Sequence, residues 1–379
     1  MLSVKGLYTE YPNDRGQTVK AAQDVAFTVP EGKLFTLLGP SGCGKTTTLR
    51  SIAGLERPVA GEISVGGRAV YSSSRNIFVP PNQRNFGMVF QSYAIWPHMN
   101  VFQNAAFPLE VRANRPGEKE IRDKVMRVLA AVGLEELAGR DATRLSGGQQ
   151  QRLALARAIA MEPKLLLLDE PLSNLDAKLR EKMRFELKRL QSEFKLTTVY
   201  VTHDQSEALA LSHEIAVMNE GRIVQIGSPR DIYERPHDPF VADFVGTSNF
   251  IDATVLGALA ERGAYRVATA LGELEVRSVD TLAARDKAVI AIRPEDVALH
   301  ETPPAEGRNA FQGKVEAQVF LGECMDFQVR VGTTLLQARA HPSLSMPAGG
   351  TLHITMNPEK CVAIPQAVNA DAHKTRNNV

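Results

Sequence analysis

The stretch Gly39-Pro40-Ser41-Gly42-Cys43-Gly44-Lys45-Thr46-Thr47 fits the pattern of a phosphate-binding loop, in which Gly is followed by four residues and then Gly-Lys-Thr. An apolar run over residues 34–38 precedes it, and a helical pattern over 46–53 follows. In this context the glycines let backbone N–H groups face inward, and the helix adds the positive end of its dipole. We therefore predict that the loop holds a polyphosphate, with Lys45 on the β- and γ-phosphates and the Thr46 hydroxyl on Mg²⁺.

The bulk composition narrows the class of protein. A chain of 379 residues predicts two domains, and a formal net charge of +1 gives no reason to expect a nucleic-acid partner. The three cysteines, Cys43, Cys324 and Cys361, have no metal or disulfide spacing, which suits a reducing compartment. Residues 1–12 lack an apolar signal segment, and no run is long enough to span a bilayer. We therefore expect any membrane association to come through a partner.

Short strands are predicted on both sides of the loop. Residues 3–7, 25–29 and 34–38 read as strands, and 61–65 with 69–71 read as a hairpin. Tyr11 is expected in an exposed turn between the first two strands, where its ring could stack on adenine. Residues 87–90 form a further short strand that ends in Gln91. At the end of a parallel strand Gln91 can offer an acceptor to a metal ion and a donor to water.

The pattern changes to helix between residues 92 and 145. Residues 101–111 and 118–132 carry apolar residues at helical spacing, as an inserted helical subdomain would. The segment Leu145-Ser146-Gly147-Gly148-Gln149 then opens a predicted helix over 149–161. Ser146 is a good N-cap, and two glycines at a helix start also expose N–H groups to an anion. The chain is therefore expected to carry a second phosphate-binding surface.

Two carboxylates end the most apolar strand of the sequence. Four leucines at 165–168 predict a central parallel strand covered on both faces, followed by Asp169 and Glu170. Asp169 is placed to hold magnesium, and Glu170 to accept a proton from the water that attacks the γ-phosphate. A turn over 173–176, a charged helix over 177–194 and a strand over 197–201 follow. His203 ends that strand and is expected to contact the γ-phosphate.

The C-terminal third has a different character. A hairpin over residues 215–218 and 222–226 is followed by a helix and a Pro-punctuated linker over 229–244. Between 249 and 366 short β-type runs alternate with Gly, Pro and Asn turns, which predicts an all-β domain of small-barrel type. The polar tail, residues 367–379, is expected to be disordered.

The ordered set of motifs resembles the ATP-binding-cassette (ABC) family over residues 1–245. The set comprises the phosphate loop, Gln91, Leu145-Ser146-Gly147-Gly148-Gln149, residues 165–170, residues 173–176 and His203. Two later stretches are similar to importer ATPases of the maltose, polyamine and ferric-iron types, which carry a C-terminal regulatory β-domain. They are residues 233–246, from Tyr233-Glu234-Arg235-Pro236 to Val245-Gly246, and Ile292-Arg293-Pro294-Glu295-Asp296.

The resemblance implies a phosphate-loop ATPase domain of α/β class over residues 1–245, with a helical subdomain over about 92–160. A small-barrel, OB-like regulatory domain follows over 246–366. The family pairs two copies head to tail, so that ATP lies between the phosphate loop of one and Ser146, Gly147 and Gly148 of the other. The nucleotide-binding set carried over is Tyr11, Gly39, Pro40, Ser41, Gly42, Cys43, Gly44, Lys45, Thr46, Thr47, Ser146, Gly147, Gly148, Gln149 and Asp176.

The same resemblance assigns chemical roles, cofactors and partners. Glu170, His203, Gln91 and Lys45 are implied as catalytic residues, and Thr46, Gln91 and Asp169 as Mg²⁺ ligands. ATP and Mg²⁺ are the implied cofactors, and residues 93–97 are expected to dock on a membrane permease. The subunit would lie peripherally on the cytoplasmic face of the inner membrane and reach a solute-binding protein only through that permease.

Other members of the family leave alternatives open. Exporter ATPases usually lack the all-β appendage with its Arg-Pro-Glu-Asp motif, and soluble members that act on DNA or ribosomes carry a long coiled coil or two cassettes. The segment Leu145–Gln149 argues against a stand-alone kinase. The junction Gly246-Thr247-Ser248-Asn249-Phe250 resembles the polyamine and ferric-iron branch more than the sugar branch, which makes polyamine or ferric iron the expected cargo and leaves sugar as the alternative.

Overall fold

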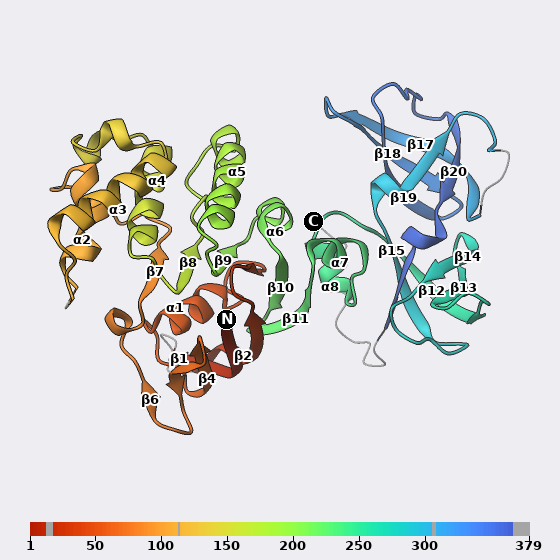
Figure 1. Ribbon diagram of the computed structural model, residues 1–379. Coiled ribbons are helices and arrows are strands. Elements are labelled where there is room, and N and C mark those ends of the chain that lie inside the picture. The colour runs from red at the N-terminus through yellow and green to blue at the C-terminus, as the bar shows by residue number, and fades with distance from the viewer. Residues whose placement is uncertain (13–17, 113, 305–307, 367–379) are drawn as a thin grey trace. The chain divides into compact units, whose positions relative to one another are not determined.

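The computed structural model describes residues 1–12, 18–112, 114–304 and 308–366 (Figure 1). These residues fall into two compact units that divide between Pro229 and Arg230. The expected boundary at 245 is later than this division, because the two short helices that follow residue 228 group mostly with the second unit. The expected disordered tail, 367–379, lies outside the described residues. No helix in the described ranges is long and apolar enough to cross a bilayer.

The first unit contains two sheets. An antiparallel sheet has the strand order β2-β1-β4-β5-β6. Its strands are β1 (Leu2–Pro12), β2 (Thr18–Val29), β4 (Ala60–Val65), β5 (Arg68–Ser72) and β6 (Ile77–Phe78). The second sheet has the order β11-β10-β3-β9-β8-β7 and is parallel except for the pair β10 and β11. Its strands are β3 (Leu34–Leu38), β7 (Phe86–Val89), β8 (Leu165–Asp169), β9 (Thr198–Thr202), β10 (Glu214–Asn219) and β11 (Arg222–Gly227).

Strand β8, between β9 and the edge strand β7, divides the core of this unit. Leu165 and Leu167 pack into one hydrophobic cluster with the antiparallel sheet and helix α1 (Lys45–Ala53). Leu166 and Leu168 pack into the other cluster, with the helices on the opposite face. Because successive side chains of a strand point to opposite faces, four consecutive leucines fit a strand that is covered on both sides. The prediction of a parallel strand covered on both faces is confirmed, although β8 lies next to the edge strand β7 and is not in the middle of the sheet.

The helices of the opposite face come from the segment that was predicted to be helical. Helices α2 (Val101–Glu110), α3 (Glu118–Ala131) and α4 (Gly147–Ala160) lie together beyond β7, as Figure 1 shows. Helix α5 (Ala177–Glu193) follows β8, and the short helix α6 (Gln205–Leu211) follows β9. Each of these two helices therefore begins shortly after the carboxyl end of a parallel strand. The loops between strand and helix form the edge at which open α/β sheets bind ligands.

The second unit begins with two short helices and continues as β structure. Helices α7 (Pro229–Glu234) and α8 (Pro239–Phe244) precede a closed barrel with the strand order β12-β13-β14-β21-β15. The barrel strands are β12 (Asn249–Ala258), β13 (Ala264–Thr269), β14 (Gly272–Arg277), β15 (Lys287–Ile292) and β21 (Val362–Pro365). A five-stranded antiparallel sheet of order β16-β20-β17-β18-β19 completes the unit. It comprises β16 (Val297–His300), β17 (Ala310–Phe320), β18 (Met325–Val331), β19 (Thr334–Ala340) and β20 (Thr351–Met356).

The predicted all-β domain of small-barrel type is thus confirmed. Strand β21 closes the barrel by pairing with β15 and, at one point, with β14, which lies far from it in the chain. A short segment whose partners are so distant carries little local signal, because pairing and burial decide its structure.

Candidate active site

The phosphate loop joins β3 to α1 and leaves its lysine buried. Lys45 is 4% exposed, and its Nζ donates hydrogen bonds to the carbonyls of Gly39 at 2.8 Å and Pro40 at 2.7 Å. Gly44 has a φ of 100°, and a Cβ there would lie 1.9 Å from the carbonyl oxygen of Ala21. Only glycine fits this position, because a side chain would collide with the backbone of strand β2. An anion that enters the loop can take the place of the two carbonyls.

Asp169 lies at the end of β8, directly beside the loop. Its Oδ1 accepts a hydrogen bond of 3.0 Å from the Thr46 hydroxyl, and its Oδ2 lies 4.0 Å from Arg50 Nε. Burial raises the pKa of Asp169, although the Thr46 hydrogen bond and Arg50 act in the opposite direction. A carboxylate that burial disfavours in this way is well suited to a cation.

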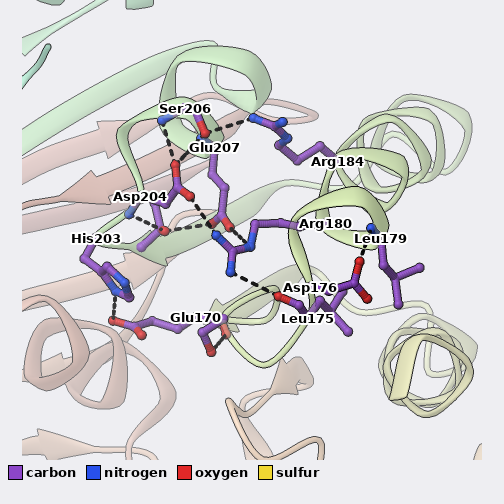
Figure 2. A network of polar contacts seen from close by, with 12 residues as sticks. Glu170, Leu175, Asp176, Leu179, Arg180, Arg184, His203, Asp204, Ser206 and Glu207 are labelled. Atoms are coloured by element: carbon purple, nitrogen blue, oxygen red, sulfur yellow. Dashed lines mark hydrogen bonds and ion pairs between the residues drawn. The ribbon is translucent and has the colours of Figure 1, made fainter. Parts of the chain in front are cut away.

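Glu170 is held in an unusual backbone conformation. Its φ is 45°, in the left-handed region that residues other than glycine seldom adopt. The Glu170 N–H donates to the carbonyl of Val201 at 3.0 Å, and the Ser173 hydroxyl donates to the Glu170 carbonyl at 2.9 Å. The side chain then meets His203, whose Nδ1 lies 3.2 Å from Oε1 (Figure 2). Strained residues that the surroundings hold in place are typical of functional sites.

Gln91 follows β7 and borders an open hollow of about 500 Å³ that also reaches Asp169. Its backbone carbonyl accepts a hydrogen bond of 2.8 Å from the Asn174 side chain. The hollow is lined by Arg50, Phe90, Gln91, Ser92, Ala94, Asp169 and Asn174. Within the described ranges, no three His, Cys, Asp or Glu side chains gather as a metal-binding group. The Thr46 hydroxyl is bonded to Asp169, and the exposed Gln91 side chain lines the same hollow as Asp169.

The predicted second anion surface lies at the start of α4. Ser146 caps α4 in a capping box, in which the Gln149 N–H donates to Ser146 Oγ at 3.4 Å and the Ser146 N–H to Gln149 Oε1 at 2.9 Å. Among the described residues, no hydrogen bond links Ser146, Gly147 or Gly148 to the phosphate loop. Asp176 likewise caps α5 and accepts a hydrogen bond of 3.0 Å from the Leu179 N–H.

Tyr11 was expected in a turn, and that expectation is wrong. It lies near the end of β1, where it pairs with Val19 of β2, because the antiparallel ladder continues to Pro12. Its hydroxyl nevertheless faces Thr47 of the phosphate loop and Glu56. Burial raises the pKa of Tyr11, and hydrogen bonding to Glu56 raises it further while Thr47 opposes the shift. The strand therefore still brings the ring beside the loop.

Sequence reasoning missed three arginines around the site. Arg50 lies one helical turn after Thr46, and this spacing was the available signal. Arg157 of α4 and Arg180 of α5 bind carbonyl groups of the loops that follow Gln91 and Glu170. Arg157 stands alone in the apolar run 153–160, which was the available signal, whereas Arg180 lies among charged residues of α5 and has none.

Comparison with known proteins agrees with this geometry. A family described as ABC transporter matches residues 22–173, and one described as TOBE domain matches residues 290–364. The chain is 46% identical over 319 residues to the trehalose/maltose import ATP-binding protein MalK of Thermococcus litoralis, covering 83% of this chain and 85% of the relative. It is 44% identical over 316 residues to the Fe(3+) ions import ATP-binding protein FbpC 1 of Rhizobium meliloti, with coverages of 83% and 85%.

A third relative and a solved structure extend the comparison. The spermidine/putrescine import ATP-binding protein PotA of Pseudomonas aeruginosa is 46% identical over 304 residues, covering 80% of this chain and 81% of the relative. An ATP-binding cassette solved as a dimer in a post-hydrolysis state, bound to ADP and Pi, has a TM-score of 0.52 and 30% identity. The match covers 61% of this chain and 99% of that one. The chain therefore belongs to the ABC transporter family, as an importer ATPase subunit with a C-terminal regulatory TOBE domain.

Proposed function

We propose that this ATPase subunit pairs head to tail with a second copy and drives solute uptake through a membrane permease. The observation that carries the proposal is the meeting of Lys45, Thr46, Asp169, Glu170 and His203 at one sheet edge. The second phosphate-binding surface, at Ser146, is not hydrogen-bonded to that edge within the described chain. Two copies in opposite orientation bring the two surfaces together, and the related cassette was solved as a dimer.

The nucleotide is assigned to the phosphate loop. The ammonium of Lys45 exchanges its bonds to Gly39 and Pro40 for the β- and γ-phosphates, and the backbone of residues 39–47 surrounds the phosphates. The ring of Tyr11, which lies beside Thr47, stacks on adenine. Ser146, Gly147, Gly148 and Gln149 of the second copy, with its Asp176, close over the γ-phosphate.

Magnesium is assigned to Thr46, Asp169 and Gln91, and the residues present fit it. A hydroxyl, a carboxylate and an amide supply the oxygen donors that Mg²⁺ prefers, and the first two already lie 3.0 Å apart. The bound ion neutralises charge on the phosphates. Ionised Asp169 is disfavoured by burial, which raises its pKa, so a cation also relieves the cost of that charge.

Hydrolysis is assigned to Glu170. Its carboxylate accepts a proton from the attacking water while the water oxygen bonds to the γ-phosphorus and ADP departs. The backbone bonds to Val201 and Ser173 hold Glu170 at the edge, and His203 fixes one carboxylate oxygen at 3.2 Å. His203 in turn contacts the γ-phosphate through its exposed side. The position of Glu170 therefore depends on whether that phosphate is present.

Residues 93–97 are assigned to the permease. Tyr93 and Ala94 both have positive φ, of 60° and 47°, and the Arg157 guanidinium donates to both of their carbonyls. Arg157 also lies 4.6 Å from the Trp96 ring centroid, and Trp96 packs edge-on against Phe107. The segment is thus fixed in shape, as a docking surface needs to be. In this arrangement the subunit lies peripherally on the cytoplasmic face of the inner membrane, and the permease links it to a solute-binding protein.

The cargo is proposed to be ferric iron or a polyamine. The proposal rests on the resemblance of the junction at residues 246–250 and on relatives named for import of Fe(3+) ions and of spermidine and putrescine. A sugar is the second candidate, because a relative named for trehalose and maltose import is equally similar.

The test is capture of the transporter with a tagged Glu170→Gln protein held in Mg-ATP. Detergent-solubilised membranes are passed over it, and co-purifying proteins are identified by mass spectrometry, with Lys45→Ala as the matched control that lacks the closed state. A multi-span permease retained only by Glu170→Gln supports the proposal, and the binding protein of that permease then decides between ferric iron, polyamine and sugar. Recovery of ribosomal or DNA-bound proteins instead would leave the ATPase chemistry in place and reject transport.

A further inference from the structure

A polar network joins two loops near Glu170, the loop that follows it in the chain and the loop that contains its partner His203. One loop, residues 173–176, leads into α5, and the other, residues 203–204, leads into α6. Asp204 caps α6, accepting hydrogen bonds from the N–H groups of Ser206 at 2.8 Å and Glu207 at 3.2 Å. His203 lies directly before that cap, so the position of its ring depends on how the cap is held.

Arg180, in the first turn of α5, connects the two loops (Figure 2). Its NH1 donates to Asp204 Oδ2 at 3.2 Å, and its NH2 donates to the Leu175 carbonyl at 3.1 Å. A planar guanidinium can serve two acceptors at once in a fixed geometry, which a lysine cannot do. A single side chain therefore ties residue 204, next to His203, to residue 175, next to Asp176.

A buried carboxylate anchors the same network to the sheet. Glu207 is 2% exposed and accepts hydrogen bonds of 2.7 Å from the hydroxyls of Tyr200 and Thr202, both in strand β9. Its Oε1 lies 3.9 Å from Arg180 Nε, which makes Arg180 the cation that faces this charge. Thr202 also accepts a hydrogen bond of 2.9 Å from the Asp204 N–H. Both neighbours of His203 are thereby bound into the network.

We propose that Arg180 is a positioning residue that couples the loop of His203 to the loop of Leu175 and Asp176. The inference rests on the proposed function, in which His203 contacts the γ-phosphate and Asp176 of each copy reaches the nucleotide held by the other. A shift of His203 on meeting the γ-phosphate moves Asp204, and Arg180 transmits that movement to the carbonyl of Leu175. Presence of the γ-phosphate in one site is thus reported to the loop that faces the partner subunit.

The test compares the affinity of each variant for ADP and for a non-hydrolysable ATP analogue, both with Mg²⁺, using the full chain. We expect Arg180→Ala to lower the ratio of analogue affinity to ADP affinity by roughly 5- to 10-fold, the lower part of the range for coupled sites. In a His203→Ala background the same substitution is expected to change the ratio less than about twofold, because the coupled group is absent.

Two further variants separate positioning from simple stabilisation. Arg184, one turn along α5, donates to the Ser206 hydroxyl at 2.9 Å and so also bridges α5 and α6, but it touches neither loop. Arg184→Ala is therefore the matched control and should leave the ratio unchanged. Arg180→Lys keeps a charge near Glu207 and supports folding, yet it cannot bind Asp204 and Leu175 together, so it should still lower the ratio.

Each outcome has a defined meaning. Equal losses of ADP and analogue affinity in Arg180→Ala and Arg180→Lys, or a loss that persists in the His203→Ala background, would overturn the coupling role. If His203→Ala itself leaves the ratio unchanged, the assignment of His203 under the proposed function fails instead. A lowered ratio in His203→Ala with an unchanged ratio in both folded Arg180 variants rejects this inference alone.

Discussion

Each unit of the protein buries a cation against backbone carbonyls, and the two cations differ in what they hold. Lys45 bonds to Gly39 and Pro40, which belong to its own loop. Arg293 is 6% exposed and donates to the carbonyls of Ala242 at 2.9 Å, Thr247 at 3.1 Å and Tyr233 at 2.9 Å, with the Tyr233 ring 4.3 Å away. Under the proposed function, phosphate oxygens replace the two carbonyls that Lys45 binds. The arginine bonds fasten separate segments of the second unit together.

Because both Lys45 and Arg293 are buried, burial of a charge does not by itself mark a functional site. A buried cation must find acceptors in either case, because an unpaired charge is costly in a protein interior. The distinguishing feature is whether the acceptors are local and replaceable or distant and structural. Arg157, in the first unit, has the second kind of contact, since it ties residues 93 and 94 to α4.

The largest effect is expected for Lys45→Ala. Loss of the ammonium removes the charge that stabilises the transferred phosphoryl group, so ATP turnover should fall by at least about a thousandfold. The free energy of unfolding should change by less than about 1 kcal/mol, because only local carbonyls lose a partner. Turnover assays and thermal melts of the same preparation check both parts. If Lys45→Ala loses activity only because it unfolds, the contacts of Lys45 are structural, like those of Arg293.

Glu170→Gln separates binding from chemistry in the same unit. The amide cannot accept the proton of the attacking water, so kcat should fall by about 10²- to 10⁴-fold. ATP should still bind, since Lys45, Thr46 and Asp169 are intact, and the closed dimer should accumulate. Rapid-mixing hydrolysis and size-exclusion chromatography in Mg-ATP measure the two effects. Hydrolysis at the native rate would remove Glu170 from the role of base.

The positions of Lys45 and Glu170 were predictable because their sequence signals are local. Loop glycines, a lysine and a threonine at fixed spacing, and two acids after four leucines, specify their geometry within a few residues. The partners of Arg293 and Arg180 could not be predicted in the same way, because their acceptors lie elsewhere in the sequence and only the fold brings them close. Tyr11 illustrates the intermediate case: the resemblance implied a contact with the nucleotide, whereas the position of Tyr11 in β1 was not foreseen.

Arg293→Ala is expected to act on stability alone. The substitution leaves three carbonyl groups without their hydrogen-bond donor and opens a space beside Tyr233. The second unit should therefore lose about 3 kcal/mol of unfolding free energy. ATP turnover per folded molecule should stay within about twofold of the native value, since the site lies in the first unit. Hydrogen exchange measured by peptide reports the stability of each unit separately.

The control for that experiment is Arg266→Ala in the same barrel. Arg266 is exposed and its Nε lies 3.9 Å from Glu273, so the change should be within about 0.5 kcal/mol. Equal destabilisation by Arg266→Ala and Arg293→Ala would show that the buried contacts of Arg293 carry no special weight.

Asp169→Asn tests whether the first unit gives up stability to maintain its site. Burial raises the pKa of Asp169 above that of the unfolded chain, so the ionised carboxylate destabilises the folded state at neutral pH. The penalty is fully present above the folded pKa and disappears as the pH falls below both values. Asp169→Asn should therefore raise the unfolding free energy of the nucleotide-free protein by about 1 kcal/mol at pH 7, with a smaller gain in acid.

The same variant should lose the stabilisation that Mg-ATP gives. Native protein gains about 2.7 kcal/mol when the nucleotide is present at a hundred times its dissociation constant, and the asparagine lacks the charge needed for the metal. Thermal melts with and without Mg-ATP across the pH range measure both effects. A nucleotide-free variant less stable than native protein would mean that Arg50 and Thr46 outweigh the burial of Asp169.

The smallest effect is expected from removing the second unit, and it depends on where the chain is cut. A chain that ends at residue 229 follows the division between the compact units and should keep basal ATP turnover within about threefold of the full chain. A chain that ends at residue 248 retains α8, whose Ala242 packs with Ala291, Val362 and Ile364 of the barrel. That cut exposes the apolar side of α8 to solvent, so the longer fragment should aggregate more than the shorter one, although both keep the whole site.

Light scattering and ATP turnover, measured on the two fragments, decide the boundary. If the longer fragment aggregates less and turns over ATP faster than the shorter one, the first unit extends to about residue 245, as the sequence alone indicates. Helices α7 and α8 would then be part of the first unit.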